Sequence, residues 1–171
     1  MMMKHFPGSL DGPRIQKLTA KTLIGMSLQM SLGDNRTRLL WQQFMPRRKE
    51  ILHALGSERY SVQNFSDDFD PRHFKSDTPF TKWAAVEVAA NTSCPVGMEK
   101  LIIPNGQYAV FHYTGPVNEA ARVFTYIFYE WLPKSPYQLD NRAHFEVLGE
   151  KYSNTSPDSE EEIWIPIVTS L

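Results

Sequence analysis

The predicted strands and helices follow the same order twice along the chain, and this repeat constrains the fold more than any other feature. A β-rich segment at residues 15–31 precedes a helical pattern at 35–56, and two short strands follow at 59–65 and 82–90. A strand at 106–115, a helix at 116–133, and strands at 144–150 and 161–168 repeat that order. A shift of 85 residues places Ile24 on Ala109 and Val62 on Val147. We therefore predict an α+β fold of two β-α-β-β units.

Start and stop residues mark both predicted helices. Asp34 or Asn35 is suited to capping the first helix, and Pro46 inside it predicts a kink or a split because proline lacks a backbone donor. Pro116 lies near the start of the second helix and Pro133 at its end. The 85-residue shift also places Trp41 on Tyr126 and Phe44 on Tyr129.

The repeat indicates one domain built from two halves. We expect residues 14–171 to form this domain, with a first half at 14–91, a connector at 92–104 and a second half at 105–168. Residues 1–13 are expected to be a flexible N-terminus, because proline and glycine interrupt them. Two such halves usually pair about a pseudo-twofold axis, and the seam between them is a natural place for a ligand cleft.

Composition excludes several classes of function. With 42% hydrophobic and 22% charged residues the chain is typical of globular proteins, and its net charge of -1 disfavours nucleic-acid binding. The single Cys94 rules out a multi-cysteine metal site, and the five histidines show no metal-binding spacing. We expect neither a metal nor another cofactor. Without a signal peptide or a long apolar run, we expect a cytoplasmic protein with no membrane contact.

One acidic residue interrupts an otherwise apolar strand. Glu146 lies between Phe145 and Val147, and its own face carries His144 and Leu148. A carboxylate in an apolar pocket is unfavourable alone, and a cationic ligand would neutralise it. The alternative is a solvated glutamate beside Lys151 or Arg142.

Four motifs in the second half resemble a known family. The segments "GQYAVFHYTG", "YEWLPKSPYQL", "FEVLGEKY" and "EIWIPI" are similar to the gyrase-inhibitor-like effector-binding domain, and the resemblance covers residues 14–168. This domain occurs in multidrug-sensing bacterial transcription regulators of the AraC and MerR types and as stand-alone proteins. The resemblance implies a shared sheet covered by helices, with Glu146 pairing with a cationic ligand. It also implies ligand contacts for Glu162 and Trp164. Because no helix-turn-helix precedes the first strand, we expect a stand-alone member.

Aromatic residues supply the predicted walls of the pocket. Aromatic faces attract cations, at roughly 0.5–2 kcal/mol per contact, and stack on flat rings. The candidates beside Glu146, Glu162 and Trp164 are Trp41, Phe44, Trp83, Tyr126 and Tyr129. The alternative for each aromatic residue is core packing.

Three functions follow as hypotheses. The first is a binding domain for a hydrophobic, cationic aromatic molecule. The second is a hydrolase of reactive, cyclopropane-bearing toxins, to which some similar stand-alone proteins are related. Glu146 would act in it as general base or charge stabiliser with Tyr60, Tyr108 or Tyr126. The third is a protein-binding inhibitor, for which the cationic run at 47–49 offers a partner contact or merely a solvated helix face.

Overall fold

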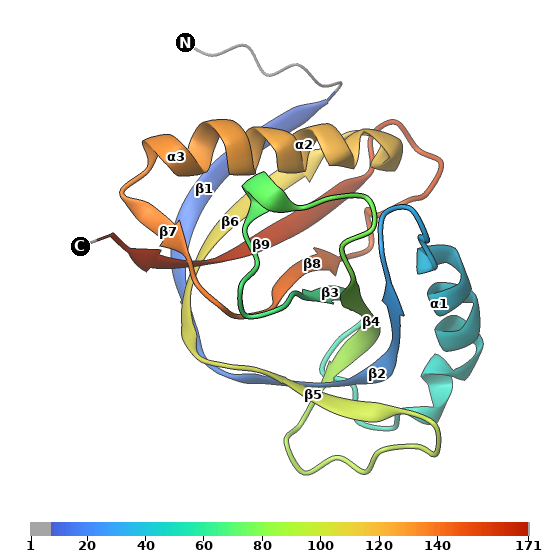
Figure 1. Cartoon of the computed structure of the whole chain (residues 1–171). Helices are drawn as coiled ribbons and strands as arrows, with labels where there is room; N and C mark the ends of the chain where they lie inside the picture. Colours follow the sequence, from blue (N-terminus) through green and yellow to red (C-terminus); the bar gives the residue numbers. More distant parts are fainter. Residues whose placement is uncertain (1–7, 171) are drawn as a thin grey trace.

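The computed structural model describes residues 8–170, which form one nine-stranded antiparallel sheet with helices packed against it (Figure 1). The strands are β1 (Ser9–Leu18), β2 (Lys21–Met30), β3 (Arg59–Asn64), β4 (Phe80–Val88), β5 (Glu99–Ile103), β6 (Gly106–Thr114), β7 (Tyr137–Leu139), β8 (His144–Leu148) and β9 (Glu160–Thr169). The helices are α1 (Thr37–Phe44), α2 (Ala120–Tyr126), the π-helical turn η4 (Ile127–Trp131) and α3 (Leu132–Lys134). Three 3₁₀ turns complete the list: η1 (Met45–Glu50), η2 (Pro71–His73) and η3 (Val117–Glu119).

The order of strands across the sheet confirms the predicted repeat. The order is β1-β6-β9-β8-β3-β4-β2-β5, so the unit β2-α1-β3-β4 lies beside the unit β6-α2-β8-β9. The two units meet where β3 pairs with β8. Ser61 pairs there with Glu146, and these two residues are also equivalent under the 85-residue shift. A pair of equivalent residues facing each other places the pseudo-twofold axis between them.

Two strands, and the first half of a third, fall outside the sequence-based prediction. β1 begins at Ser9, inside the segment expected to be flexible, and pairs with β6 along its length. β5 lies inside the predicted connector and pairs with the edge of β2. β7 pairs with the end of β9. The expected flexibility of residues 1–7 concerns residues outside those that the structure describes. Figure 1 shows β1–β2 and β5–β6 as two long ribbons that bend around the lower side of the molecule.

Prolines shape both helical segments as their chemistry requires. α1 ends at Phe44, one residue before the 3₁₀ turn that contains Pro46, so the predicted split is confirmed. Asn35 Oδ1 accepts a hydrogen bond from the backbone N–H of Thr37 at 3.0 Å and so satisfies the start of α1. The second segment widens into η4 immediately before Pro133, which has no N–H for the helical ladder.

The two helical segments bury equivalent faces, but the residue shift that relates them differs from the 85-residue shift that relates the strands. Leu40 and Phe44 are the buried residues of α1, and Val123 and Ile127 hold the same places in the second segment. The expected overlay of Phe44 on Tyr129 is wrong, because Phe44 is fully buried and Tyr129 is 53% exposed. The helices are therefore offset by two residues relative to the strand overlay.

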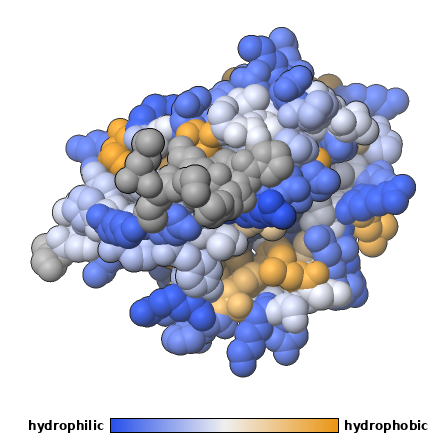
Figure 2. All heavy atoms as spheres, turned by 90° about the horizontal axis from the view of Figure 1, so that it is seen from above, coloured by the Kyte–Doolittle hydropathy of each residue, from blue (hydrophilic) through white to orange (hydrophobic). Residues whose placement is uncertain are grey.

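The two faces of the sheet carry separate cores. On one face, Ile24 and Ala84 pack with α1, and Phe111 and Ile163 pack with α2. We call this the helix face. The opposite face packs a continuous cluster that includes Val62, Tyr108, Phe145 and Trp164, which the bent ribbons enclose. Seen from above, the outer surface is largely hydrophilic, with hydrophobic side chains in separate small patches (Figure 2).

Candidate functional site

Glu146 lies on the helix face at the centre of the seam. Its neighbours across the strands are Ser61 on β3 and Ile163 on β9, and Ile163 packs in the core beneath α2. Gln63 Nε2 donates to Glu146 Oε1 at 3.4 Å, whereas the buried Glu146 Oε2 has no hydrogen-bond partner among the described residues. Burial raises the pKa of the Glu146 carboxyl to about 8, against the opposing effect of Lys82. An unpartnered buried carboxylate oxygen is costly and calls for an explanation.

Two further charged residues act on Glu146 from neighbouring strands. Lys82 on β4 pairs with Gln63 across the ladder, and its Nζ donates to Thr37 Oγ1 at 3.2 Å. Burial lowers the pKa of the Lys82 amine, and Glu146 and Glu161 oppose this shift. Glu161 on β9 shares the face of Ile163, and burial raises the pKa of its carboxyl to about 7. The site thus contains two acids and one base, all poorly solvated.

Tyr152 adds a phenol to this charged cluster. It follows β8, and the Arg59 guanidinium lies over its ring at 5.7 Å. Burial raises the pKa of Tyr152, and the charges of Glu161 and Glu146 add to the shift. At neutral pH the phenol is therefore protonated and able to donate a hydrogen bond.

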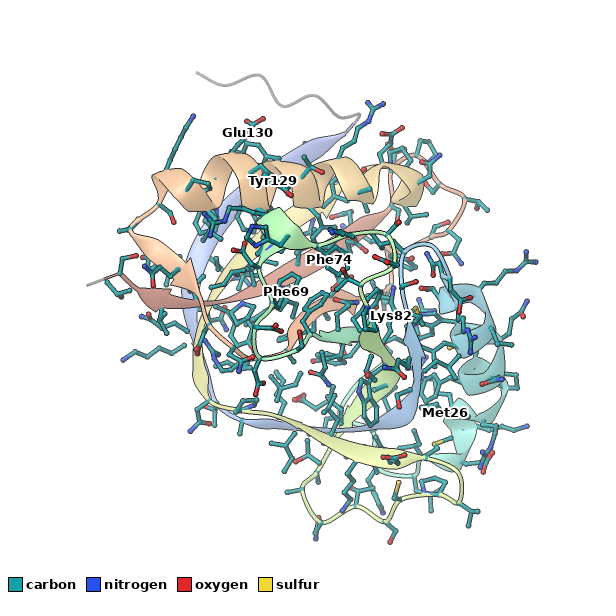
Figure 3. The ribbon with its side chains drawn as sticks, in the orientation of Figure 1. Met26, Phe69, Phe74, Lys82, Tyr129 and Glu130 are labelled. Carbon is teal, nitrogen blue, oxygen red and sulfur yellow. The ribbon has the colours of Figure 1, made fainter. Side chains whose placement is uncertain are left out.

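Aromatic side chains of the β3–β4 loop cover the adjoining part of the helix face. The rings of Phe65 and Phe69 stack at 4.0 Å, and Phe74 contacts both. We call these three residues the aromatic cap. Phe65 and Phe69 meet His144, which precedes Glu146 by two residues on the same face, at 4.9 and 5.7 Å. Figure 3 shows Phe69 and Phe74 on the loop that passes below α2.

The loop that carries the cap is fastened to the second helical segment. The Tyr129 hydroxyl donates to the carbonyl oxygen of Pro71 at 2.8 Å, and Phe128 approaches His144 at 5.9 Å. His144 itself is buried, and burial lowers its pKa to about 3, so its ring is neutral.

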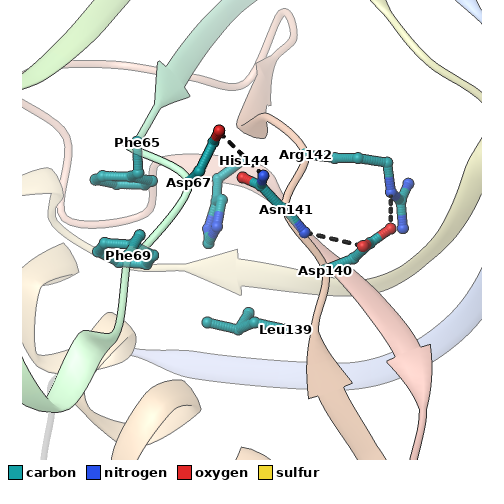
Figure 4. A pocket seen from close by; sticks show the side chains of 8 residues that line it. All are labelled: Phe65, Asp67, Phe69, Leu139, Asp140, Asn141, Arg142 and His144. Atoms are coloured by element: carbon teal, nitrogen blue, oxygen red, sulfur yellow. Dashed lines mark hydrogen bonds and ion pairs between the residues drawn. The ribbon is translucent and has the colours of Figure 1, made fainter.

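Two hollows border the cap. A cavity of about 110 Å³ lies between the stacked rings of Phe65 and Phe69, His144 and the β7–β8 turn with Asn141 (Figure 4). A wider groove of about 510 Å³ begins beyond Phe69, and its walls include Phe128 and Tyr137. The cavity is smaller than a drug-sized ligand, for which pockets of about 300–1,000 Å³ are usual.

The chain matches a known domain family over most of its length. The family model described as "GyrI-like small molecule binding domain" matches residues 12–168. The chain belongs to the GyrI-like family. The GyrI-like chain is also 26% identical over 158 residues to "Transcriptional regulator BrlR" of Pseudomonas aeruginosa. That match covers 90% of this chain and 54% of the regulator, so the chain spans about half the length of this curated relative.

Solved structures agree on the fold of this GyrI-like domain. The EcmrR C-terminal domain superposes with a TM-score of 0.67 at 11% identity, covering 95% of this chain and 98% of the other. SAV2435 bound to tetraphenylphosphonium superposes with a TM-score of 0.61 at 16% identity, covering 91% and 93%. These likenesses establish the α+β fold, and the family model together with the curated relative shows a small-molecule-binding domain that is related to a transcriptional regulator.

The GyrI-like fold separates residues that we expected to share one cleft. Trp164 pairs with Phe145, not with Glu146, so Trp164 and Glu162 lie on the face opposite Glu146. Trp164 stacks on Phe145 at 5.2 Å and is 5% exposed, and Glu162 forms an ion pair with Arg14 at 2.9 Å. The prediction of a single cleft is wrong because successive residues alternate between the faces of a strand.

The remaining predicted residues divide between the faces. Trp83 is buried on the opposite face, as are Tyr60 and Tyr108, and the Tyr108 hydroxyl donates to the Ala143 carbonyl at 3.0 Å. On the helix face, Trp41 packs edge-on against Phe44 in the core under α1. Tyr126 packs against the core under α2, and Tyr129 contacts the cap loop. Of the eight predicted ligand contacts, Glu146 belongs to the charged cluster, and Tyr129 binds the loop that carries the cap.

Three residues of the cluster were not predicted. Lys82 lies on β4 and alternates with the buried Ala84 and Val86, on the face opposite the predicted contact Trp83. Glu161 begins the last predicted strand and lies within β9, where its face continues into Ile163. Tyr152 follows β8 in a polar segment.

Residues 8–170 contain no group of three or more histidine, cysteine, aspartate or glutamate side chains that could hold a metal ion. Within the same residues of this GyrI-like chain, every helix is too short or too polar to cross a membrane.

Proposed function

We propose that this chain binds hydrophobic aromatic cations on the helix face of its sheet, with Glu146 as the counter-charge. The observation that carries the proposal is the buried Glu146 Oε2, which has no hydrogen-bond partner in the part of the chain that the structure describes. A cationic ligand would supply the missing interaction and restore the favourable ionised form. The binding of tetraphenylphosphonium by SAV2435, which shares the fold, supports this class of ligand.

The aromatic cap supplies the apolar surface that such a ligand needs. Phe65, Phe69 and Phe74 present ring faces beside His144, and aromatic faces attract cations. The 110 Å³ cavity is too small for a drug-sized molecule, so binding moves the cap toward the wider groove beyond Phe69. The ligand then occupies the space that the cap fills in the free protein.

Calorimetric titration with tetraphenylphosphonium tests the proposal. The wild-type chain is expected to bind with a stoichiometry of about one, and Glu146→Gln is expected to weaken binding at least about thirtyfold, since loss of a buried charge partner costs about 2–5 kcal/mol. Glu99→Gln is the matched control, because Glu99 is exposed at the sheet edge on β5. Equal affinity of wild type and Glu146→Gln would contradict the proposal, as would no binding to wild type.

A hydrolase is the second candidate, and the surroundings of Tyr152 favour it. Two carboxyls with pKa values of about 8 and 7 lie in one cluster with this phenol, and a general base works best when its pKa is near the working pH. A cyclopropane-bearing electrophile would be the substrate, with Glu146 as the base. Mass spectrometry after incubation separates the candidates, because ring-opened product in excess of protein requires turnover, whereas recovery of intact ligand indicates binding alone.

A further inference from the structure

The charged cluster of Glu146, Glu161 and Lys82 has two acidic side chains but only one basic side chain. Glu146, Glu161 and Lys82 lie on the same face of adjoining or nearby strands, and one buried oxygen of Glu146 has no partner within residues 8–170. If all three were ionised, the poorly solvated cluster would carry one excess negative charge. Isolated charges of this kind are expensive away from water, and such groups take up a proton instead. The free cluster is electroneutral when Lys82 is protonated and the two carboxyls together retain one proton.

We infer that this cluster exchanges one proton for one monovalent cation, and that Lys82 limits the ligand to a single positive charge. The inference rests on the proposed function, because it describes how the same site balances its charge. With a monocation bound, two carboxylates face one ammonium and one ligand charge, so the complex is electroneutral as well. A dication would leave one excess positive charge beside Lys82, unless that ammonium lost its proton.

The other groups around Glu146 do not supply the balancing charge. Ser61 and Gln63 on β3 are neutral, and Thr37 on α1 accepts the Lys82 hydrogen bond. His144 on β8 is neutral because burial lowers its pKa to about 3. Arg59 lies over Tyr152 at 5.7 Å, and it acts on the phenol. The cap contributes only phenylalanine rings on this side. The balance therefore depends on Lys82, Glu146 and Glu161.

Proton release on binding is the first readout. Titration with tetraphenylphosphonium in two buffers of different ionisation enthalpy should show about one proton released per ligand near pH 7.5, between the pKa values of the two carboxyls, and almost none above pH 9. The dissociation constant should fall about tenfold per pH unit around pH 7.5 and become constant above about pH 9. Tight binding to wild type with no proton release at pH 7.5 would overturn the inference and leave the proposed function intact. Absence of any binding would overturn both.

The preference for a singly charged over a doubly charged ligand is the second readout. N-methyl-4,4′-bipyridinium and N,N′-dimethyl-4,4′-bipyridinium share one framework but carry one and two charges. Wild type should prefer the monocation by about tenfold or more, a difference of about 1.4 kcal/mol. Lys82→Met should remove or reverse this preference, and Lys82→Gln serves as the second variant if Lys82→Met does not fold. An unchanged preference in a folded variant would overturn the role of Lys82.

A rescue experiment separates charge balance from simple structural damage. Glu161→Gln should weaken tetraphenylphosphonium binding by about tenfold or more, because Lys82 then already balances the remaining Glu146 carboxylate. In Lys82→Met/Glu161→Gln, Glu146 again holds a proton that a cation can replace, so affinity should return to within about threefold of wild type. Failure of the second substitution to restore binding, with both variants folded by circular dichroism, would overturn the inference.

Discussion

Ser61 and Glu146 face each other across the seam between β3 and β8, at positions that the repeat makes equivalent. One unit therefore carries a small hydroxyl where the other carries a carboxylate. The hydroxyl accepts a hydrogen bond from Gln63 Nε2 at 3.1 Å, and Gln63 reaches only one oxygen of the acid. A symmetric pair of glutamates would place two like charges at the axis, which is strongly unfavourable when buried. The difference between the units thus places a single carboxyl group at the axis.

The stability of the protein should depend on the charge of this residue. The folded state raises the pKa of Glu146 from 4.5 to about 8, so it binds the proton more tightly than the unfolded chain does. The free energy of unfolding therefore falls as the pH rises from about 4.5 to 8. Relative to wild type, Glu146→Gln should gain roughly 3–4 kcal/mol between pH 5 and pH 8.5, since one pKa unit corresponds to about 1.4 kcal/mol. Urea denaturation at both pH values measures this, and a constant difference between the proteins would contradict the shift.

The sequence pointed to Glu146 because alternation within one strand can be read directly. It could not show which residues of β4 and β9 share its face, because that depends on the register between strands. A one-residue change of register would have brought Trp164 beside Glu146, and the actual pairing of Trp164 with Phe145 brings Glu161 and Ile163 to the helix face instead. Lys82 was missed for the same reason.

Among the elements, the β3–β4 loop controls access to the site under the proposed function. Its cap rests against His144, and the hydrogen bond from Tyr129 to the Pro71 carbonyl fastens it to the second helical segment. Arg72 and His73 beside that hydrogen bond are exposed, so we expect opening of this part of the loop to precede binding.

Removal of the Tyr129 hydroxyl should make the loop open more readily. A hydrogen bond of this kind contributes about 0.5–1.5 kcal/mol, so Tyr129→Phe should strengthen tetraphenylphosphonium binding by about two- to tenfold. Hydrogen exchange should rise in residues 66–75, while exchange in β6 and β9 serves as the internal control. Weaker binding by Tyr129→Phe would contradict the idea that this hydrogen bond holds the loop closed. It would favour a direct ligand contact for the Tyr129 side chain.

The order of the elements could be predicted because each has its own local pattern. The strands alternate or run apolar, and prolines mark the helices at Pro46, Pro116 and Pro133. β1 and β5 were missed because their stability comes from pairing with β6 and β2, which is a tertiary property. Proline and glycine in β1 suggested an irregular segment, although its edge position tolerates proline.

On the scale of the whole molecule, the two faces of the sheet differ in how they are covered. The bent ribbons close one face around Tyr108, Phe145 and Trp164, whose rings contact one another. The other face is covered by two separate helices and a loop, so the covering can change locally while the enclosed core remains intact. Under the proposed function, this division would let the helix face admit a bulky ligand without unfolding of the domain.

The structure of the complex with tetraphenylphosphonium tests the central claim most directly. We predict the phosphonium on the helix face, within van der Waals contact of Glu146, with Phe65, Phe69 and Phe74 displaced from their positions beside His144. Density for the ligand among Trp83, Tyr108 and Trp164 on the opposite face, with the cap unmoved, would contradict the account.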